Sequence, residues 1–233
     1  MGAPNGRLPF RVPASIVMQF MEVVCLQQQY FSSKPESASD PTVIKAAVRS
    51  QDLMLTADHG VFSRKGVDVG SVLLAQSAVV KPGATVLDLG CGYGVVGISI
   101  ARSVQGTDVW MVDVNERAVK LSAQNATRNN VGDRTRVLLS DGTSALPDGL
   151  LFDVILFNPP IRAGKRVVFS LYEQACRRLE TDGVLYVVIR VKQGANSSER
   201  FLLELFGSVE TAARDRGYKV FACTMVRRTQ NKN

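Results

Sequence analysis

From residue 72 to residue 191, short apolar stretches alternate with longer amphipathic ones. The apolar stretches are rich in Val, Leu and Ile, which is typical of buried strands. The amphipathic stretches have the length of helices that cover a sheet. The alternation predicts an α/β fold: a doubly wound, mostly parallel sheet with helices on both faces. The expected strands are 85–89, 108–114, 136–139, 152–157 and 184–191, and the expected helices are 72–80, 95–103, 116–129, 167–179 and 199–205.

The two ends of this region depart from the alternation. Residues 42–48 and 53–56 read as a β-hairpin, with residues 49–52 as the connection. Near the other end, expected strands at 209–213 and 218–225 follow each other across a short turn with Gly217. Two consecutive strands without a helix between them predict a terminal antiparallel hairpin.

Residues 1–28 differ from the rest, and we expect them to form an extension before a single domain at 29–233. Apolar residues at helical spacing predict one amphipathic helix in the extension. Gln19 and Glu22 interrupt the apolar run, so the segment does not read as a secretory signal. We expect a cytoplasmic protein, with an organellar transit peptide as the alternative reading of 1–28.

The charge and the metal-binding residue types limit the possible functions. The chain carries a formal net charge of +7, and residues 1–42 contribute none of it. A basic folded body favours a polyanionic partner, nucleic acid first, although a basic protein without such a partner has the same composition. His59 is the only histidine, and the four cysteines form no CxxC pair. We therefore expect no metal site and no disulfide framework.

A glycine-rich loop follows the expected strand 85–89. Two glycine patterns overlap in this loop. The first is GxGxxG, which is typical of dinucleotide sites, at Gly92, Gly94 and Gly97. The second is DxGxGxG, which runs from Asp88 to Gly94. The first is out of register, because the strand should lead directly into its first glycine. The second resembles the first motif of class I S-adenosylmethionine-dependent methyltransferases. An acidic residue before the glycines suits a ligand with an ammonium and a sulfonium. The expected cofactor residues here are Asp88, Gly90, Cys91, Gly92 and Gly94.

Acidic residues that follow the next two strands support this frame. Asp113 lies 23 residues after Gly90, close to the spacing at which a carboxylate receives ribose hydroxyls. The alternative is that Asp113 caps the next helix, although Asn115 could do so instead. Val114 joins Asp113 in the expected cofactor site. Asp141 and Gly142 end the third strand, where methyltransferases place an adenine contact, but Asp-Gly is also common in turns.

The sequence Asn158-Pro159-Pro160 ends the expected strand 152–157 and should face the same crevice as the glycine loop. Pro160 restricts Pro159 to an extended shape, so we expect an unpaired Pro159 carbonyl that points into the site. With the Asn158 side-chain oxygen, it gives two acceptors for the N–H groups of a planar amine. Catalysis would then be mostly positioning. These three residues are the expected catalytic segment, and Asn158 is also an expected cofactor contact.

Segments 60–71 and 158–165 together resemble the RsmC-type family of small-subunit ribosomal RNA guanine-N2 methyltransferases, and its short single-domain members above all. The resemblance runs from Tyr30 to Val226. It implies a seven-stranded sheet with an antiparallel last strand, S-adenosylmethionine as cofactor, and ribosomal RNA or the small ribosomal subunit as partner. It also implies that Phe62 and Ser63 lie in a loop over the cofactor. The expected RNA contacts are Phe62, Ile161, Arg162, Lys165 and Arg166.

The sequence leaves two other functions open. Asn-Pro-Pro also occurs in methyltransferases that act on adenine N6 or on protein glutamine amides. The second alternative is a non-catalytic RNA-binding module of the same fold. Full-length RsmC proteins also carry a second, degenerate methyltransferase-like domain that helps to hold RNA. We find no counterpart of it in this sequence, so the resemblance does not specify the target nucleotide.

Overall fold

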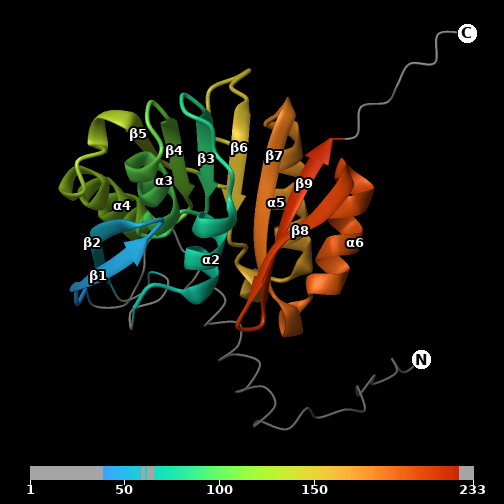
Figure 1. Ribbon diagram of the computed structural model, residues 1–233, viewed down its shortest axis with the longest axis horizontal. Helices are drawn as coiled ribbons and strands as arrows, with labels where there is room; N and C mark the ends of the chain where they lie inside the picture. Colours follow the sequence, from blue (N-terminus) through green and yellow to red (C-terminus); the bar gives the residue numbers. More distant parts are fainter. Residues whose placement is uncertain (1–38, 59–60, 62–65, 226–233) are drawn as a thin grey trace, which may run out of the picture.

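The computed structural model describes residues 39–58, 61 and 66–225. Its main sheet has seven strands, in agreement with the predicted α/β fold. They are β3 (Thr85–Leu89), β4 (Asp108–Asp113), β5 (Thr135–Leu139), β6 (Phe152–Phe157), β7 (Leu179–Arg190), β8 (Gly207–Asp215) and β9 (Tyr218–Met225). Their order is β5-β4-β3-β6-β7-β9-β8 (Figure 1). The first five in this order are parallel, and β9 is antiparallel to both β7 and β8. The predicted terminal hairpin is confirmed.

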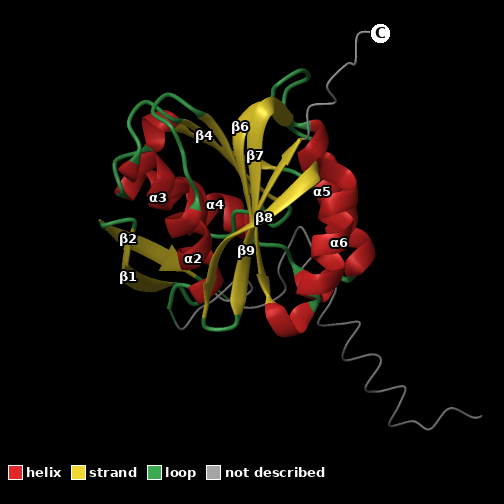
Figure 2. Cartoon of the chain, turned by 45° about the vertical axis from the view of Figure 1, so that its right-hand side comes forward, coloured by secondary structure: helices red, strands yellow, loops and turns green. Residues whose placement is uncertain are grey.

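Helices cover both faces of the sheet (Figure 2). One face carries α2 (Val69–Ser77), α3 (Val95–Ser103) and α4 (Glu116–Arg128), and the other carries α5 (Lys165–Arg177) and α6 (Ala195–Phe206). Successive strand side chains point to opposite faces, so the core has two halves. Val86 packs in the half under α2–α4, and Leu87 packs in the half under α5 and α6. Short 3₁₀ turns are Gly132–Arg134, Ile161–Ala163 and Val191–Gln193.

The N-terminal hairpin, β1 (Thr42–Val48) and β2 (Gln51–Ala57), forms a separate two-stranded sheet. Two asparagines hold it: Asn125 in α4 and Asn129 at the C-cap of this helix. The Asn125 side chain accepts from Thr56 N at 2.8 Å and donates to Thr56 O at 2.9 Å. Asn129 makes the same pair of bonds with Met54, at 3.0 and 2.9 Å. The two amides therefore satisfy one edge of β2 as a neighbouring strand would. Asn125 also donates to the Tyr93 carbonyl, at 2.9 Å, which ties the hairpin to the glycine loop.

Several predicted boundaries were wrong. Helix α6 begins at Ala195 and not at residue 199, and β8 spans Gly207–Asp215 and not 209–213. The β1–β2 connection is the two-residue turn Arg49-Ser50, with φ of 53° and 58°, and not residues 49–52. Helix α2 begins three residues earlier than predicted because Asp68 caps it. Strand β7 begins at Leu179, five residues earlier than predicted. Its register with β6 shifts between the pairs Phe152–Leu179 and Val154–Val184, and the strand continues through Asp182-Gly183, a dipeptide that is common in turns.

Some predictions fall outside the described residues. These are the helix within 1–28, the loop residues Phe62 and Ser63, and His59. Among the helices that are described, none has the length and apolar character needed to cross a membrane. The division into an extension and one domain at 29–233 stays a prediction.

Candidate active site

The glycine loop turns sharply at the carboxyl end of β3. The N–H groups of Gly90 and Cys91 both donate to the Val112 carbonyl of β4, at 2.8 and 2.9 Å. Gly90, Gly92 and Gly94 have φ of 70°, 56° and 91°, the left-handed region that favours glycine. A Cβ on Gly94 would lie 2.5 Å from Ser122 Oγ. The loop thus needs glycine for its backbone shape and for its packing against α4.

Asp113 ends β4 beside this loop. Its Oδ2 accepts from Gly92 N at 2.8 Å, and its Oδ1 accepts from Asn115 N at 2.9 Å. Asn115 is the residue that caps α4, since its side chain accepts from Arg117 N and Ala118 N. The alternative reading of Asp113 as the helix cap is therefore wrong. Burial raises the pKa of Asp113 although its backbone donors act in the opposite direction. Val114 follows it and is half-buried.

Asp88 lies below the loop and not in the crevice. Only 3% of it is exposed, and its Oδ2 accepts from Gly97 N in the first turns of α3 at 2.8 Å. Burial, reinforced by the charge of Asp113, raises the pKa of Asp88 to about 7. The sequence argument that Asp88 meets a cationic ligand does not agree with this position, because the carboxyl is enclosed. Asp88 instead ties α3 to β3.

Cys91 serves the loop through its backbone. Its thiol is buried, and Sγ lies 3.6 Å from Ser122 Oγ. Burial raises the pKa of this thiol, with the charges of Asp113 and Asp88 acting in the same direction. A buried neutral thiol is a poor nucleophile.

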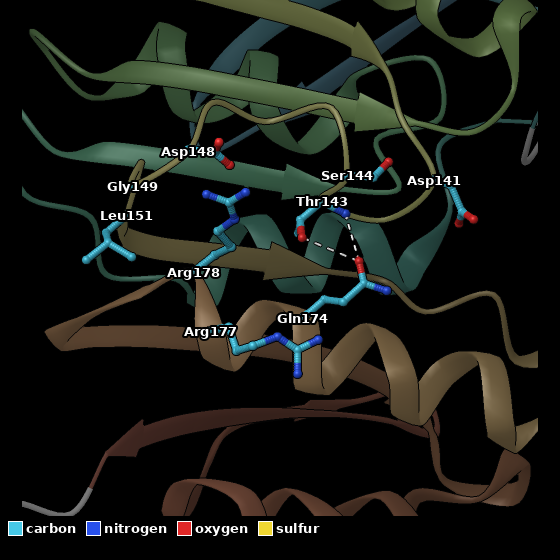
Figure 3. A pocket seen from close by; sticks show the side chains of 9 residues that line it. All are labelled: Asp141, Thr143, Ser144, Asp148, Gly149, Leu151, Gln174, Arg177 and Arg178. Carbon is cyan, nitrogen blue, oxygen red and sulfur yellow. Dashed lines mark hydrogen bonds between the residues drawn. The ribbon is translucent and has the colours of Figure 1, made fainter.

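Asp141 and Gly142 follow β5 at the same end of the sheet. Asp141 is exposed, and Gly142 has φ of 57°. The neighbouring Thr143 donates its N–H to Gln174 Oε1 of α5 at 2.9 Å. Asp141 stands at one end of an open hollow of about 650 Å³ that runs along α5 (Figure 3). The lining residues are Asp141, Thr143, Ser144, Asp148, Gly149, Leu151, Gln174, Arg177 and Arg178.

Asn158 follows β6, the strand beside β3. Leu89 and Phe157 are register partners, so the residues after them, Gly90 and Asn158, leave the sheet side by side. The Asn158 side-chain nitrogen donates to Asp68 Oδ2 at 3.2 Å and to Ser71 Oγ at 3.0 Å. With the nitrogen engaged in this way, the amide oxygen is the end left for a ligand.

The Pro159 carbonyl was predicted to be unpaired, and this prediction was wrong. Ile161 N donates to it at 2.9 Å, because Pro160 has φ of −74° and ψ of 79° and closes a three-residue turn. A carbonyl has two lone pairs, so one acceptor position of Pro159 remains. The half-buried Ile161 packs against the core under α5.

The predicted basic residues lie in the 3₁₀ turn before α5 and in the first turn of that helix. Arg162, Lys165 and Arg166 are exposed there, just after the Asn-Pro-Pro segment. Among the described residues, no group of three His, Cys, Asp or Glu side chains could hold a metal ion.

Sequence reasoning missed Asp68 and Ser71, the two residues that bind the Asn158 side chain. A possible signal was Asp68 itself, a good N-cap residue directly before an apolar run.

The family model of the methyltransferase small domain matches residues 52–222. The chain belongs to this family. It is 40% identical over 204 residues to the uncharacterised protein YbxB of Bacillus subtilis, covering 86% of this chain and 100% of that one. It is 34% identical over 170 residues to ribosomal RNA small subunit methyltransferase C of Pseudomonas syringae, covering 70% of this chain and 48% of that one.

One solved structure is similar to this chain in both fold and sequence. It is T. thermophilus RsmC, a 16S rRNA N2 methyltransferase in complex with AdoMet and guanosine, with a TM-score of 0.70 and 27% identity. The match covers 82% of this chain and 52% of that one. The chain thus spans about half the length of its RsmC relatives. The predicted family, class I fold, enzyme class and cofactor, S-adenosylmethionine, are confirmed at the level of the family.

Proposed function

We propose that this methyltransferase transfers a methyl group from S-adenosylmethionine to N2 of a guanosine in ribosomal RNA. The observation that carries the proposal is the adjacency of its two site segments. The glycine loop and Asn158 leave neighbouring strands at paired positions, Leu89 and Phe157. A cofactor on the first segment and an amine on the second would therefore lie next to each other, as ligands do beyond the carboxyl ends of parallel strands.

The residues after β3 and β4 suit the proposed cofactor. The nearest atom to a Cβ built on Gly90 is Phe157 Cε2 at 3.9 Å, so a ligand can approach the backbone there. Each oxygen of the Asp113 carboxylate accepts one backbone N–H and keeps lone pairs for ribose hydroxyls. Asp141 and Gly142 would contact the adenine. When bound, S-adenosylmethionine supplies an electrophilic methyl group on a sulfonium.

The acceptor amine would be held by the Asn-Pro-Pro segment. The Asn158 amide oxygen and the second lone pair of the Pro159 carbonyl each accept one N–H of the amine, which directs the nitrogen lone pair toward the methyl group. This pair of acceptors also stabilises the nitrogen as it becomes positively charged in the transition state. The residues contribute alignment and electrostatics and form no covalent bond.

Ribosomal RNA is the acceptor that the charge and the relatives favour. The body is basic, and Arg162, Lys165 and Arg166 are exposed beside Asn158, where phosphates that flank a target base would lie. T. thermophilus RsmC, with guanosine in its structure, is named as a 16S rRNA methyltransferase, and the relative from P. syringae is named as a small-subunit one. A relative from Shewanella amazonensis, 28% identical, is named ribosomal RNA large subunit methyltransferase G. Guanosine N2 in small-subunit RNA is therefore the first target to test.

Mass mapping of methylated nucleosides in RNA from cells with and without the protein tests this proposal. We expect one N2-methylguanosine in small-subunit RNA to disappear without the protein and to return with the wild-type chain. The catalytically impaired Asn158→Ala chain should not restore it. Loss of N6-methyladenosine, or of a methylated glutamine in a protein, would identify one of the alternative acceptors. RNA binding without any loss of methylation would indicate a binding module.

A further inference from the structure

The start of α2 binds the side-chain amide of Asn158 through its nitrogen. Asp68 is the N-cap of this helix and Ser71 is in its first turn, and both contact the Asn158 nitrogen. The contacts join residues 90 and 87 positions apart in sequence. Asp68 is half-buried and Ser71 is 4% exposed, so water competes weakly for these bonds.

The two contacts differ in what they can specify. The oxygen and nitrogen ends of an amide have nearly the same shape, so a rotation of 180° about the last side-chain bond exchanges them. A serine hydroxyl can donate or accept, and it therefore tolerates either end. An ionised carboxylate can only accept, and it repels the oxygen end. Asp68 alone of these two partners distinguishes the ends of the Asn158 amide.

We infer that Asp68 is a positioning residue that keeps the oxygen of Asn158 turned toward the acceptor amine. With the amide reversed, its N–H groups would face the N–H groups of the substrate, and the amine would lose one of its two acceptors. The inference concerns catalysis and therefore rests on the proposed function. The orientation of the amide can be measured without any substrate.

The surroundings of Asp68 fix the carboxylate itself. Its Oδ2 accepts from Ser71 N at 2.9 Å, and the Tyr218 hydroxyl of β9 donates to its Oδ1 at 3.4 Å. Burial raises the pKa of Tyr218, and the charge of Asp68 acts in the same direction, so the hydroxyl keeps its proton. A Cβ on Gly70 would lie 2.9 Å both from Asp68 Oδ2 and from the Tyr218 ring. Glycine at position 70 thus lets β9 and the helix cap close around the carboxylate.

Asp68→Ser separates the two roles of this side chain. Serine is a good N-cap, so it can still accept from Ser71 N and preserve the start of α2. Its shorter side chain has one oxygen, which does not extend to Asn158. Ser77→Ala is the matched control, because it removes a side-chain bond to the Leu73 carbonyl at the far end of the same helix. Thermal melts and S-adenosylmethionine affinity establish that each variant is folded and has an intact cofactor site.

The kinetic test is a double-mutant cycle in single-turnover methyl transfer. We expect Asp68→Ser to slow the chemical step roughly tenfold to hundredfold, the range for a lost hydrogen bond to a charged group. Ser77→Ala should match wild type. In the Asn158→Ala background, Asp68→Ser should have no further effect, because its influence passes through Asn158. A full-speed Asp68→Ser variant, or an effect that multiplies with that of Asn158→Ala, would overturn the inference.

A second measurement reports on the amide without a substrate. The side-chain NH₂ signal of Asn158 in an ¹H–¹⁵N spectrum is assigned by its loss in Asn158→Ala. We expect it to move and to exchange faster with water in Asp68→Ser but not in Ser77→Ala. If the protein methylates no RNA but its Asn158 signal changes in this way, the proposed function is refuted, and the conclusion that Asp68 anchors the Asn158 amide stands. An Asn158 signal that is the same in Asp68→Ser and wild type would refute the anchoring.

Discussion

The backbone N–H of Gly92 donates to Oδ2 of Asp113 at 2.8 Å, which links the glycine loop to the end of the neighbouring strand. The loop is fixed a second time by β4, since Gly90 and Cys91 both donate to Val112. The loop and the carboxylate are thus one preorganised unit and do not depend on a ligand to meet. Preorganisation of this kind lowers the cost of ordering groups on binding.

Asp113→Ala should weaken S-adenosylmethionine binding at least tenfold. It removes the carboxylate proposed to accept two ribose hydroxyls, and hydrogen bonds to charged groups contribute roughly 1.5–3 kcal/mol each. Isothermal titration calorimetry measures the affinity. Asp108→Ala, at the other end of β4, is the control and should bind as wild type does. Unchanged affinity in Asp113→Ala, or stabilisation of the protein by NAD, would refute the assignment of this site.

Asp88 should make the protein less stable as the pH rises from about 4 to about 7. Its folded pKa of about 7 lies above the value near 3.9 of a free carboxyl, so in this window the folded state binds more protons than the unfolded state. Each pH unit of full difference changes the free energy of unfolding by about 1.4 kcal/mol. Asp88→Asn keeps an acceptor for Gly97 N and removes the titration.

Thermal melts at pH 5 and pH 8 without cofactor test this prediction. The melting temperature of Asp88→Asn relative to wild type should be several degrees higher at pH 8 than at pH 5, since about 1 kcal/mol corresponds to 2–4 °C at this chain length. Asp133→Asn, which alters an exposed carboxyl, should show no such difference. Equal pH dependence in Asp88→Asn and wild type would mean that Asp88 is ionised throughout.

Sequence patterns predicted the central elements best. The bounds of β3, α3 and β6 agree with the structure because local signals mark their ends: glycines after Leu89 and prolines after Asn158. The turn at Arg49 and Ser50 could not be predicted, since neither residue favours a positive φ. Long-range bonds compensate there: the Arg49 guanidinium donates to the Ala75 and Ala78 carbonyls at 2.6 and 2.9 Å.

The candidate site likewise combines features that the sequence predicts with contacts that it does not. The sequence order of strands brings Asp113 and Asn158 to one edge of the sheet, and a topological rule was enough to expect it. The contact of Asp68 with Asn158 depends on how α2 lies across the ends of β6 and β9, which no local pattern encodes. The bond from Ile161 to the Pro159 carbonyl was missed because proline stereochemistry allows both an open and a turned shape at Pro160.

Asn125→Ala should destabilise the protein by about 3 kcal/mol or more. It leaves Thr56 N, Thr56 O and the Tyr93 carbonyl without their partner, and an unsatisfied buried polar group costs about 1–3 kcal/mol. Urea unfolding measures the loss. Gln124→Ala, an exposed neighbour on α4, should stay within about 0.5 kcal/mol of wild type. A comparable loss in both variants would point to the helix and not to the hairpin contact.

Arg162, Lys165 and Arg166 should contribute to RNA binding through phosphates. Replacing all three with Gln should lower the slope of log affinity against log salt by about two to three, because each phosphate contact contributes about 0.9 in duplex and about 0.7 in single strands. Fluorescence anisotropy across a salt series measures the slope. The control replaces Lys45, Lys81 and Lys120, which are exposed elsewhere on the protein. If only the control changes the slope, the RNA surface lies away from α5.

Asn158→Ala should slow methyl transfer by about 10²–10³ and leave cofactor affinity nearly unchanged. The expected factor is that of one preorganised hydrogen-bonding group lost from a transition state. Because Asn158 is half-buried just after β6, the amine has to enter the site, so a guanosine should leave its stack before it reacts. A guanosine in a loop should therefore react faster than one in a duplex. Single-turnover assays with both RNAs, using wild type and Asn158→Ala, separate the two effects. Equal rates for variant and wild type would mean that Asn-Pro-Pro is only a turn, and equal rates for loop and duplex would mean that the base reacts without leaving its stack.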